Sequence, residues 1–201
     1  MLTQFAPYDP RYHVGINVAV GDITGDGYAD IITGANTGNP HVKVFSGKAI
    51  AHGTFDPNNP DASLLASYFA YGLNFNVGVN VAVGDVNNDG FADIITGASI
   101  GNPHVKVYDG QTIADGTFNP DQSILEVFFA FDLNQDIGVS VGTADFIGDG
   151  RADIITGSAT HIRQYRVVDG LHSSGVKPPA INCIEGTLMG TFHDPFGVRV
   201  A

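Results

Sequence analysis

The chain has a single cysteine, no tryptophan, few basic residues and no apolar run near the length of a membrane span. Cys183 has no second cysteine to pair with, so a disulfide framework is excluded and the redox compartment stays open. A spanning helix needs about 18 consecutive apolar residues, and no basic-then-apolar leader follows Met1. We therefore expect no membrane insertion and no secretion signal within these residues.

Positive charge is scarce. Nine Lys and Arg stand against 21 Asp and Glu, which gives a formal net charge of -12. Such a surface repels phosphate backbones and anionic lipid. Nucleic acid is therefore not an expected partner.

What the chain does have is glycine, at 26 residues, proline, at 10, and short runs of Val, Ile, Phe and Tyr between turn residues. Glycine and proline interrupt helices, whereas β-branched and aromatic residues favour strands. No segment has the pattern of a long amphipathic helix. The composition predicts an all-β fold.

An internal repeat dominates the sequence. Residues 17–35 recur as 80–98 and, more loosely, as 140–158. Their first aspartates are separated by 63 and then 60 residues. Each copy continues with further strand-like runs, which in the first copy predict four strands at about 14–21, 29–35, 41–46 and 64–71. The matching last runs are 124–131 and roughly 184–192.

Beyond that block, Gly-Asn-Pro-His-Val-Lys stands at 38–43 and again at 101–106, while the third copy keeps only the run 165–170. A four-stranded antiparallel sheet per repeat, stacked on similar neighbours, is the blade arrangement of a β-propeller. A β-solenoid repeats at shorter intervals, and a β-sandwich does not explain near-identical copies.

We therefore expect residues 1–201 to form one β-propeller segment of three blades in a partial ring. Its predicted parts are strand 4 of a preceding blade at 1–13, blade 1 at 14–76, blade 2 at 77–136, blade 3 at 137–195 and the start of a next blade at 196–201. Propellers close with about 4–8 blades. The chain is thus either a piece of a longer protein or half of a homo-oligomer, and both leave exposed blade faces.

Three nine-residue loops, 22–30, 85–93 and 145–153, carry aspartate at positions 1, 5 and 9 and glycine at position 6. Side-chain oxygens at 1, 3, 5 and 9 and a backbone carbonyl at 7 suit a hard cation, and Ca²⁺ fits better than Mg²⁺ or a transition metal. We expect up to three structural Ca²⁺ ions, with these ligands: Asp22, Thr24, Asp26, Tyr28, Asp30, Asp85, Asn87, Asp89, Phe91, Asp93, Asp145, Asp149, Arg151 and Asp153.

The position-6 glycines, Gly27, Gly90 and Gly150, are expected at positive φ, where a Cβ is costly. A single Asp-Gly loop is also an ordinary turn signal, so the metal interpretation depends on three copies in register. Ile147 stands where the third loop needs a side-chain ligand. The third site is therefore expected to be weaker or empty.

These residues resemble FG-GAP repeats, the blades of the integrin α-subunit propeller and of many bacterial secreted proteins. The Phe-Gly pair of the name is matched by Val14-Gly15, Val77-Gly78, Ile137-Gly138 and Phe196-Gly197. Gly-Ala-Pro is matched, without its proline, by Gly34-Ala35-Asn36, Gly97-Ala98-Ser99 and Gly157-Ser158-Ala159. The resemblance covers nearly the whole chain and identifies it as a suspected FG-GAP protein of bacterial type.

The resemblance implies Ca²⁺ in loops on one face, an extracellular or cell-surface location, and an adhesion or binding role toward a protein or glycan. The alternatives are a non-catalytic propeller domain beside a secreted enzyme, or a lectin-like propeller. No catalytic residues are expected. Gly97 to Gly101 matches a Gly-x-Ser-x-Gly elbow around Ser99, but that motif needs a strand leading into a helix.

Overall fold

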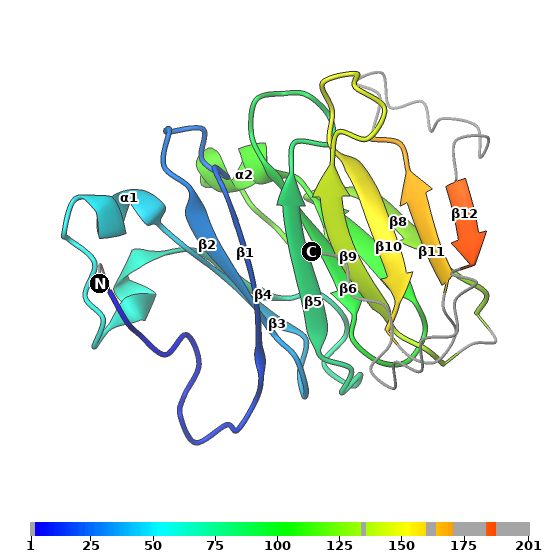
Figure 1. Cartoon of the computed structure of the whole chain (residues 1–201). Coiled ribbons are helices and arrows are strands. Elements are labelled where there is room, and N and C mark those ends of the chain that lie inside the picture. The colour runs from blue at the N-terminus through cyan, green and yellow to red at the C-terminus, as the bar shows by residue number, and fades with distance from the viewer. Residues whose placement is uncertain (1–2, 134–135, 160–163, 171–183, 188–201) are drawn as a thin grey trace.

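Three four-stranded antiparallel sheets lie side by side in the protein (Figure 1). The structure is a computed structural model that describes residues 3–133, 136–159, 164–170 and 184–187. The fold is all-β, as predicted, and its sheets are β-propeller blades. In each sheet the strand order follows the chain, so every blade is a meander of hairpins.

In the part of the chain that the structure describes, two short helices and one 3₁₀ turn lie between the third and fourth strands of blades 1 and 2. Blade 1 contains β1 (Ile16–Gly21), β2 (Asp30–Ala35), β3 (His41–Phe45), α1 (Gly47–Ala51), η1 (Pro60–Ser63) and β4 (Leu64–Phe69). Blade 2 contains β5 (Val79–Gly84), β6 (Asp93–Ala98), β7 (His104–Tyr108), α2 (Gly110–Ala114) and β8 (Ile124–Phe129). Blade 3 contains β9 (Val139–Ala144), β10 (Asp153–Ser158), β11 (Gln164–Val168) and β12 (Ile184–Thr187).

The strand ends differ from the predicted ones by one or two residues, for local reasons. β3 stops at Phe45 because Ser46 caps α1, its Oγ accepting a hydrogen bond from the Ala49 N–H at 3.2 Å. β4 stops at Phe69 because Ala70 N–H donates to the Pro40 carbonyl outside the ladder, at 2.9 Å. The apolar run of the fourth strand continues to Tyr71, so it did not predict the end of β4. The pattern also did not predict the short helices.

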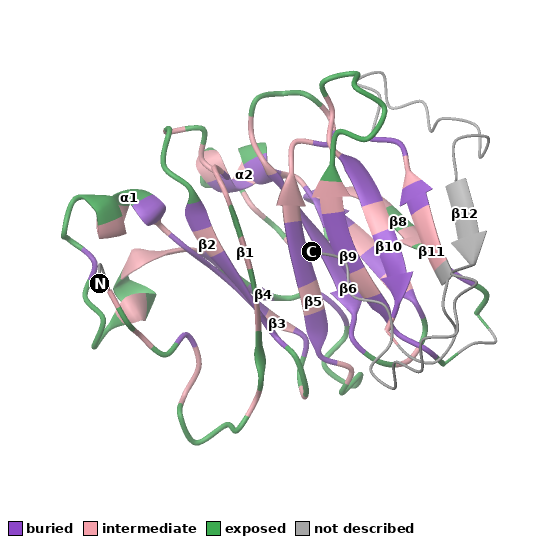
Figure 2. Cartoon of the chain, in the orientation of Figure 1, coloured by how far each residue is buried: buried purple, intermediate pink, exposed green. Residues whose placement is uncertain are grey.

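The hydrophobic core lies between the sheets. One cluster joins blade 1 to blade 2, with Ile32, Val42 and Val44 packed in the same group as Val79 and Ile94. A second cluster joins blade 2 to blade 3 through residues of β6, β7, β9 and β10. Figure 2 shows that β2, β6 and β10, the second strands of the three blades, are buried along most of their length. Each blade is thus buried by its neighbours, as expected for a propeller.

The first strands of the blades lie next to one another. The Asn17 side-chain amide donates to the Val79 carbonyl at 2.9 Å, and the Asn80 amide donates to the Val139 carbonyl at 2.7 Å. Equivalent asparagines, Asn17 and Asn80, therefore join β1 to β5 and β5 to β9. Such repeated contacts between first strands place them at the inner edge of the arc.

The first strand of blade 1, β1, is more exposed than the first strand of blade 2, β5. Val18 and Val20 are 60% and 63% exposed, whereas Val79 and Val81 of β5 are covered by blade 1. The exposed blade face that the sequence predicted is therefore present on β1 in this chain.

Tyr8 contacts blade 1 in the way that Tyr71 contacts blade 2. The Tyr8 hydroxyl donates to the His41 carbonyl at 2.8 Å, and the Tyr71 hydroxyl donates to the His104 carbonyl at the same distance. Residues 3–15 contain no strand. This equivalence supports the assignment of 1–13 to a preceding blade, which stays a prediction.

Two further expectations fall outside the described residues. The run 184–192 is described only as far as β12, and the expected start of a next blade at 196–201 is not described. Among the described residues, no helix combines the length and the apolarity needed to cross a bilayer.

The close approach of the sheets yields a testable prediction. A Cβ on Gly97 would lie 2.7 Å from the Val139 carbonyl oxygen, and one on Gly34 would lie 2.7 Å from the Val79 carbonyl oxygen. Gly97→Ala and Gly34→Ala should each lower the free energy of unfolding by about 2 kcal/mol, because backbone must move to make room.

Gly116→Ala is the matched control. No atom lies within 4 Å of its added Cβ, so only its φ of +68° opposes alanine, at about 1 kcal/mol. Denaturant unfolding measures all three. Wild-type stability of Gly97→Ala would contradict the close packing.

Candidate metal-binding loops

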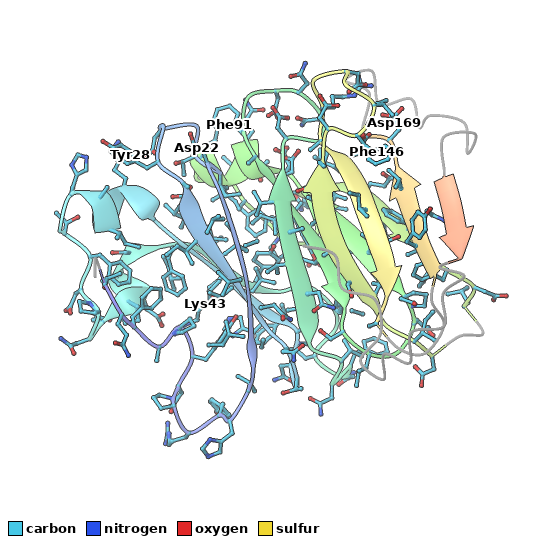
Figure 3. The ribbon with its side chains drawn as sticks, viewed as in Figure 1. Asp22, Tyr28, Lys43, Phe91, Phe146 and Asp169 are labelled. Atoms are coloured by element: carbon cyan, nitrogen blue, oxygen red, sulfur yellow. The ribbon has the colours of Figure 1, made fainter. Side chains whose placement is uncertain are left out.

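Each aspartate loop connects the first and second strands of its blade. The strand residues that flank the loops are paired across the ladder, Gly21 with Asp30, Gly84 with Asp93 and Ala144 with Asp153. All three loops therefore lie at the same end of the sheets. Asp22, Phe91 and Phe146 mark this end in Figure 3.

The position-1 aspartate organises each loop around its own carboxylate. Asp22 accepts hydrogen bonds from the N–H groups of Asp26 and Gly27, at 3.0 and 2.8 Å. Asp85 and Asp145 accept the equivalent bonds in the other two loops. The position-6 glycines have φ of 85°, 91° and 88°, which confirms the predicted positive φ.

Positions 3 and 5 add further oxygens. Asp26 accepts a hydrogen bond from the Tyr28 N–H at 3.0 Å, and Asp89 accepts one from the Phe91 N–H at 2.9 Å. The Asn87 side chain donates to Asp89 at 2.8 Å. In loops 22–30 and 85–93 the side chains at positions 1, 3, 5 and 9 thus all carry oxygen ligands of the type that Ca²⁺ prefers.

The position-9 aspartate is fully buried and bonds to two other segments of its blade. Asp93 accepts the Val86 N–H at 3.0 Å on one oxygen and the Gly110 N–H at 3.0 Å on the other. Asp30 and Asp153 make the same pair of bonds in their blades. This carboxylate therefore connects the start of the loop and the segment just after the third strand to the start of the second strand.

Sequence reasoning missed that structural role, although a signal was present. A glycine follows each position-9 aspartate by 17 residues, at Gly47, Gly110 and Gly170. A Cβ on Gly110 would clash with the Ala92 carbonyl, and one on Gly47 with the Ala29 carbonyl. The glycine is needed so that its N–H can reach the buried carboxylate.

Burial raises the pKa of Asp30, and it raises the pKa of Asp93 to about 7. The backbone hydrogen bonds to each carboxylate oppose this shift, while the charges of Asp26 and Asp89, respectively, add to it. The position-5 and position-9 carboxylates therefore repel each other within their loops.

The third loop differs in two side chains. Ile147 is 54% exposed at position 3 and offers no oxygen. The Arg151 guanidinium at position 7 forms an ion pair with Asp149 and lies 3.6 Å from Asp169. A basic side chain of the loop itself thus neutralises the position-5 acid.

Basic neighbours also distinguish the first two loops. Lys48 of α1 lies 3.6 Å from Asp26. Around Asp85, Asp89 and Asp93, by contrast, the described residues place no basic nitrogen within 4.0 Å. Loop 85–93 therefore carries the least compensated negative charge.

Within the described ranges, no three or more His, Cys, Asp and Glu side chains are grouped so as to hold a metal ion. The loop carboxylates instead accept backbone N–H groups. The predicted ligand residues of each loop are neighbours in the structure, but their coordination of Ca²⁺ stays a prediction.

The loops of adjacent blades are bonded to one another. Ala92 N–H donates to the Asp22 carbonyl at 3.1 Å, and Ala152 N–H donates to the Asp85 carbonyl at 2.8 Å. A Cβ on Gly25 would lie 2.8 Å from the Phe91 ring, so that ring covers the preceding loop. Each loop is therefore in direct contact with the loop of the next blade.

Ser99 does not lie on a nucleophile elbow. It follows β6, and the next element in the chain is β7 rather than a helix. Its hydroxyl is buried without a hydrogen-bond partner. The geometry that the Gly-x-Ser-x-Gly motif requires is absent around this residue.

Blades that bury their faces against each other and carry a loop between the first two strands define a β-propeller module. Residues 14–49 and 77–113 match the family model of the FG-GAP repeat. The chain therefore carries FG-GAP repeats, as its motifs predicted. These matches do not test the expected bacterial type, which stays a prediction.

Known relatives agree with this family. Integrin alpha-8 of Gallus gallus is 37% identical over 93 residues, which cover 46% of this chain and 8% of the integrin. Integrin alpha-8 of Mus musculus is 36% identical over 95 residues, 47% of this chain and 8% of the integrin. Integrin alpha-7 of Rattus norvegicus is 29% identical over 192 residues, 87% of this chain and 16% of the integrin. The chain thus spans a small part of these relatives.

The buried carboxylate predicts a contrast between two aspartates of one loop. In excess chelator near pH 8, Asp93→Ala should lower the free energy of unfolding by about 2–3 kcal/mol, because the buried N–H groups of Val86 and Gly110 lose their acceptor. Asp89→Ala, at a more exposed position, should cost less than about 1 kcal/mol. Urea unfolding measures both, and equal costs would contradict the structural role of Asp93.

Proposed function

We propose that this chain is a calcium-stabilised propeller module of an extracellular or cell-surface protein, with a binding or adhesion role. Two observations support it. The first is the loop with an all-oxygen donor set, repeated in register at the joints between blades. The second is the similarity to integrin alpha chains over FG-GAP repeats.

Ca²⁺ would be held by the side chains of positions 1, 3, 5 and 9 and by the carbonyl of position 7. In loop 85–93 these are Asp85, Asn87, Asp89, Phe91 and Asp93. The bound ion would supply positive charge where two carboxylates repel each other. The same ligand types in loop 22–30 are Asp22, Thr24, Asp26, Tyr28 and Asp30.

The observation that carries the structural role is the backbone bonding between consecutive loops. Asp22 at position 1 of the first loop accepts the Ala92 N–H at position 8 of the second. An ion that fixes Asp22 would therefore also fix the joint between blades 1 and 2. We propose a clamp rather than a catalytic ion, because the loop carboxylates are bound to the backbone.

The surrounding charges set an order of affinity. Loop 85–93 should bind Ca²⁺ most tightly, since no basic side chain among the described residues competes for its acids. Loop 22–30 follows because Lys48 lies beside Asp26. Loop 145–153 should be weakest, since Arg151 already pairs with Asp149 and Ile147 replaces an oxygen ligand.

The partners that we propose fall into two groups. The apolar row on β1, with Val18 and Val20, would be covered by a further blade of the same protein or by a second copy in a homo-oligomer. The ligand of the assembled module would be a protein or a glycan.

Calcium should raise the thermal stability of the chain. At a concentration about 100-fold above its Kd, one site contributes about 2.7 kcal/mol. We expect a clear upward shift of Tm, with much of it lost in Asp89→Ala and little in Asp149→Ala. Differential scanning calorimetry against NaCl of matched ionic strength separates binding from screening. No shift beyond the NaCl control would refute the proposal.

The third loop can be given the ligand positions of the second. Ile147→Asn with Arg151→Phe installs the residues of positions 3 and 7 of loop 85–93. Isothermal titration calorimetry should then count one more tight site per chain than in the wild type. Arg151→Phe alone is the control, because it removes the cation without adding the missing ligand. An unchanged count would show that other residues limit the third loop.

A further inference from the structure

A cavity of about 470 Å³ opens at the joint between blades 1 and 2. Its lining comes from the β4–β5, β6–β7 and β8–β9 connections and from residues of β7 and the end of β8. It therefore lies at the opposite end of the sheets from the aspartate loops. Its volume is within the roughly 300–1,000 Å³ typical of small-molecule sites. None of the proposed Ca²⁺ ligands lines it.

The repeated Gly-Asn-Pro-His-Val-Lys motif forms one wall of this cavity. In blade 2, Gly101, Asn102, His104 and Lys106 all line it. Part of the motif has a packing role, since His104 stacks on Phe129 with ring centroids 4.8 Å apart. That packing does not require an ammonium group at position 106.

Lys106 differs from its counterpart in blade 1 in one respect. Lys43 forms an ion pair with Asp61 at 2.7 Å, and its side chain is 10% exposed. Lys106 occupies the same strand position, but no carboxylate among the described residues lies within 4.0 Å of its Nζ. Its Nζ lies over the Tyr71 ring, 5.6 Å from the centroid. The charge of Asp121, the counterpart of Asp61, acts on it from beyond ion-pair distance.

The half-buried ammonium group of Lys106 therefore faces the cavity without a direct ion pair, and only the more distant charge of Asp121 attracts it. Burial lowers the pKa of Lys106, as desolvation of a cation does. A charge in such a place is stabilised by an anionic group that enters the cavity. The chain as a whole repels anions, so the selectivity must come from this local contact.

The remaining walls are aromatic. Phe75 of the β4–β5 connection is 61% exposed and Phe129 at the end of β8 is 40% exposed, and both line the cavity with Tyr71. Exposed aromatic faces gain by covering a flat apolar group. Asp136 lies on the same rim and can accept a hydrogen bond from a ligand that carries a donor.

We propose that this cavity binds a small carboxylic acid with a flat apolar body, its carboxylate at Lys106 and its body against Phe75 and Phe129. The site is separate from the aspartate loops and does not depend on the calcium proposal.

The test uses the whole chain and 3-phenylpropionate, titrated by isothermal calorimetry. We expect saturable binding of one molecule per chain. The neutral analogue 3-phenylpropanamide should bind at least about tenfold more weakly, because it lacks the charge that meets Lys106. Lys106→Met should abolish the difference between acid and amide. Phe75→Ala should weaken both ligands.

Lys48→Met is the matched control, because Lys48 lies beside the aspartate loop and does not line the cavity. It should bind the acid as the wild type does. Thermal unfolding of each variant verifies that it folds. The proposal is overturned if the wild type shows no saturable binding up to about 10 mM acid, or if acid and amide bind equally to it.

Phenylalanine as a second ligand identifies the source of the carboxylate. If phenylalanine binds more tightly than 3-phenylpropionate, and Asp136→Asn removes that advantage, the natural ligand is assigned as a free amino acid. If phenylalanine binds more weakly, the ligand is assigned as a simple acid. Either result supports the site. The titrations are repeated in Ca²⁺ and in chelator. Acid binding without a calcium effect on Tm, or the reverse, separates the failure of one proposal from that of the other.

Discussion

The buried carboxylate at the start of each second strand holds together the loop, the second strand and the segment that follows the third strand. Asp93 does this with two backbone hydrogen bonds, to Val86 and Gly110, and Asp30 and Asp153 repeat it. A buried charge is unfavourable, and burial raises the pKa of Asp93 to about 7. The backbone N–H groups, and the cation that we propose, reduce that cost.

Several other features depend on this arrangement. The position-8 alanine, just before the buried aspartate, donates its N–H to the position-1 carbonyl of the previous loop, which joins consecutive blades. At the opposite end of the sheets the joint is made by a tyrosine, Tyr8 or Tyr71, that reaches the backbone of the following blade. Both ends of the joint between blades 1 and 2 are therefore fixed by polar groups, with an apolar core between them.

Because the blades repeat, positions at which one blade differs from the others stand out. Arg151 gives the third loop a cation of its own, and Ile147 removes an oxygen, so equivalent positions differ in charge. Lys106 lacks the ion pair that Lys43 makes with Asp61. Because the backbone around these positions is the same, the differences reside in single side chains and can be tested by exchanging them.

By itself, the sequence determined the all-β fold, the blade repeat and the loop positions, because the alternation of apolar residues and the recurring Asp-Gly loops are local patterns. It also gave the positive φ of Gly27, Gly90 and Gly150, which only the absence of a Cβ makes cheap. Tertiary structure alone decided that Asp93 is buried with backbone N–H partners and that Lys106 faces a cavity. Both properties depend on residues that are distant in the sequence, such as Asp93 and Gly110, which are 17 positions apart and meet only once the chain has folded.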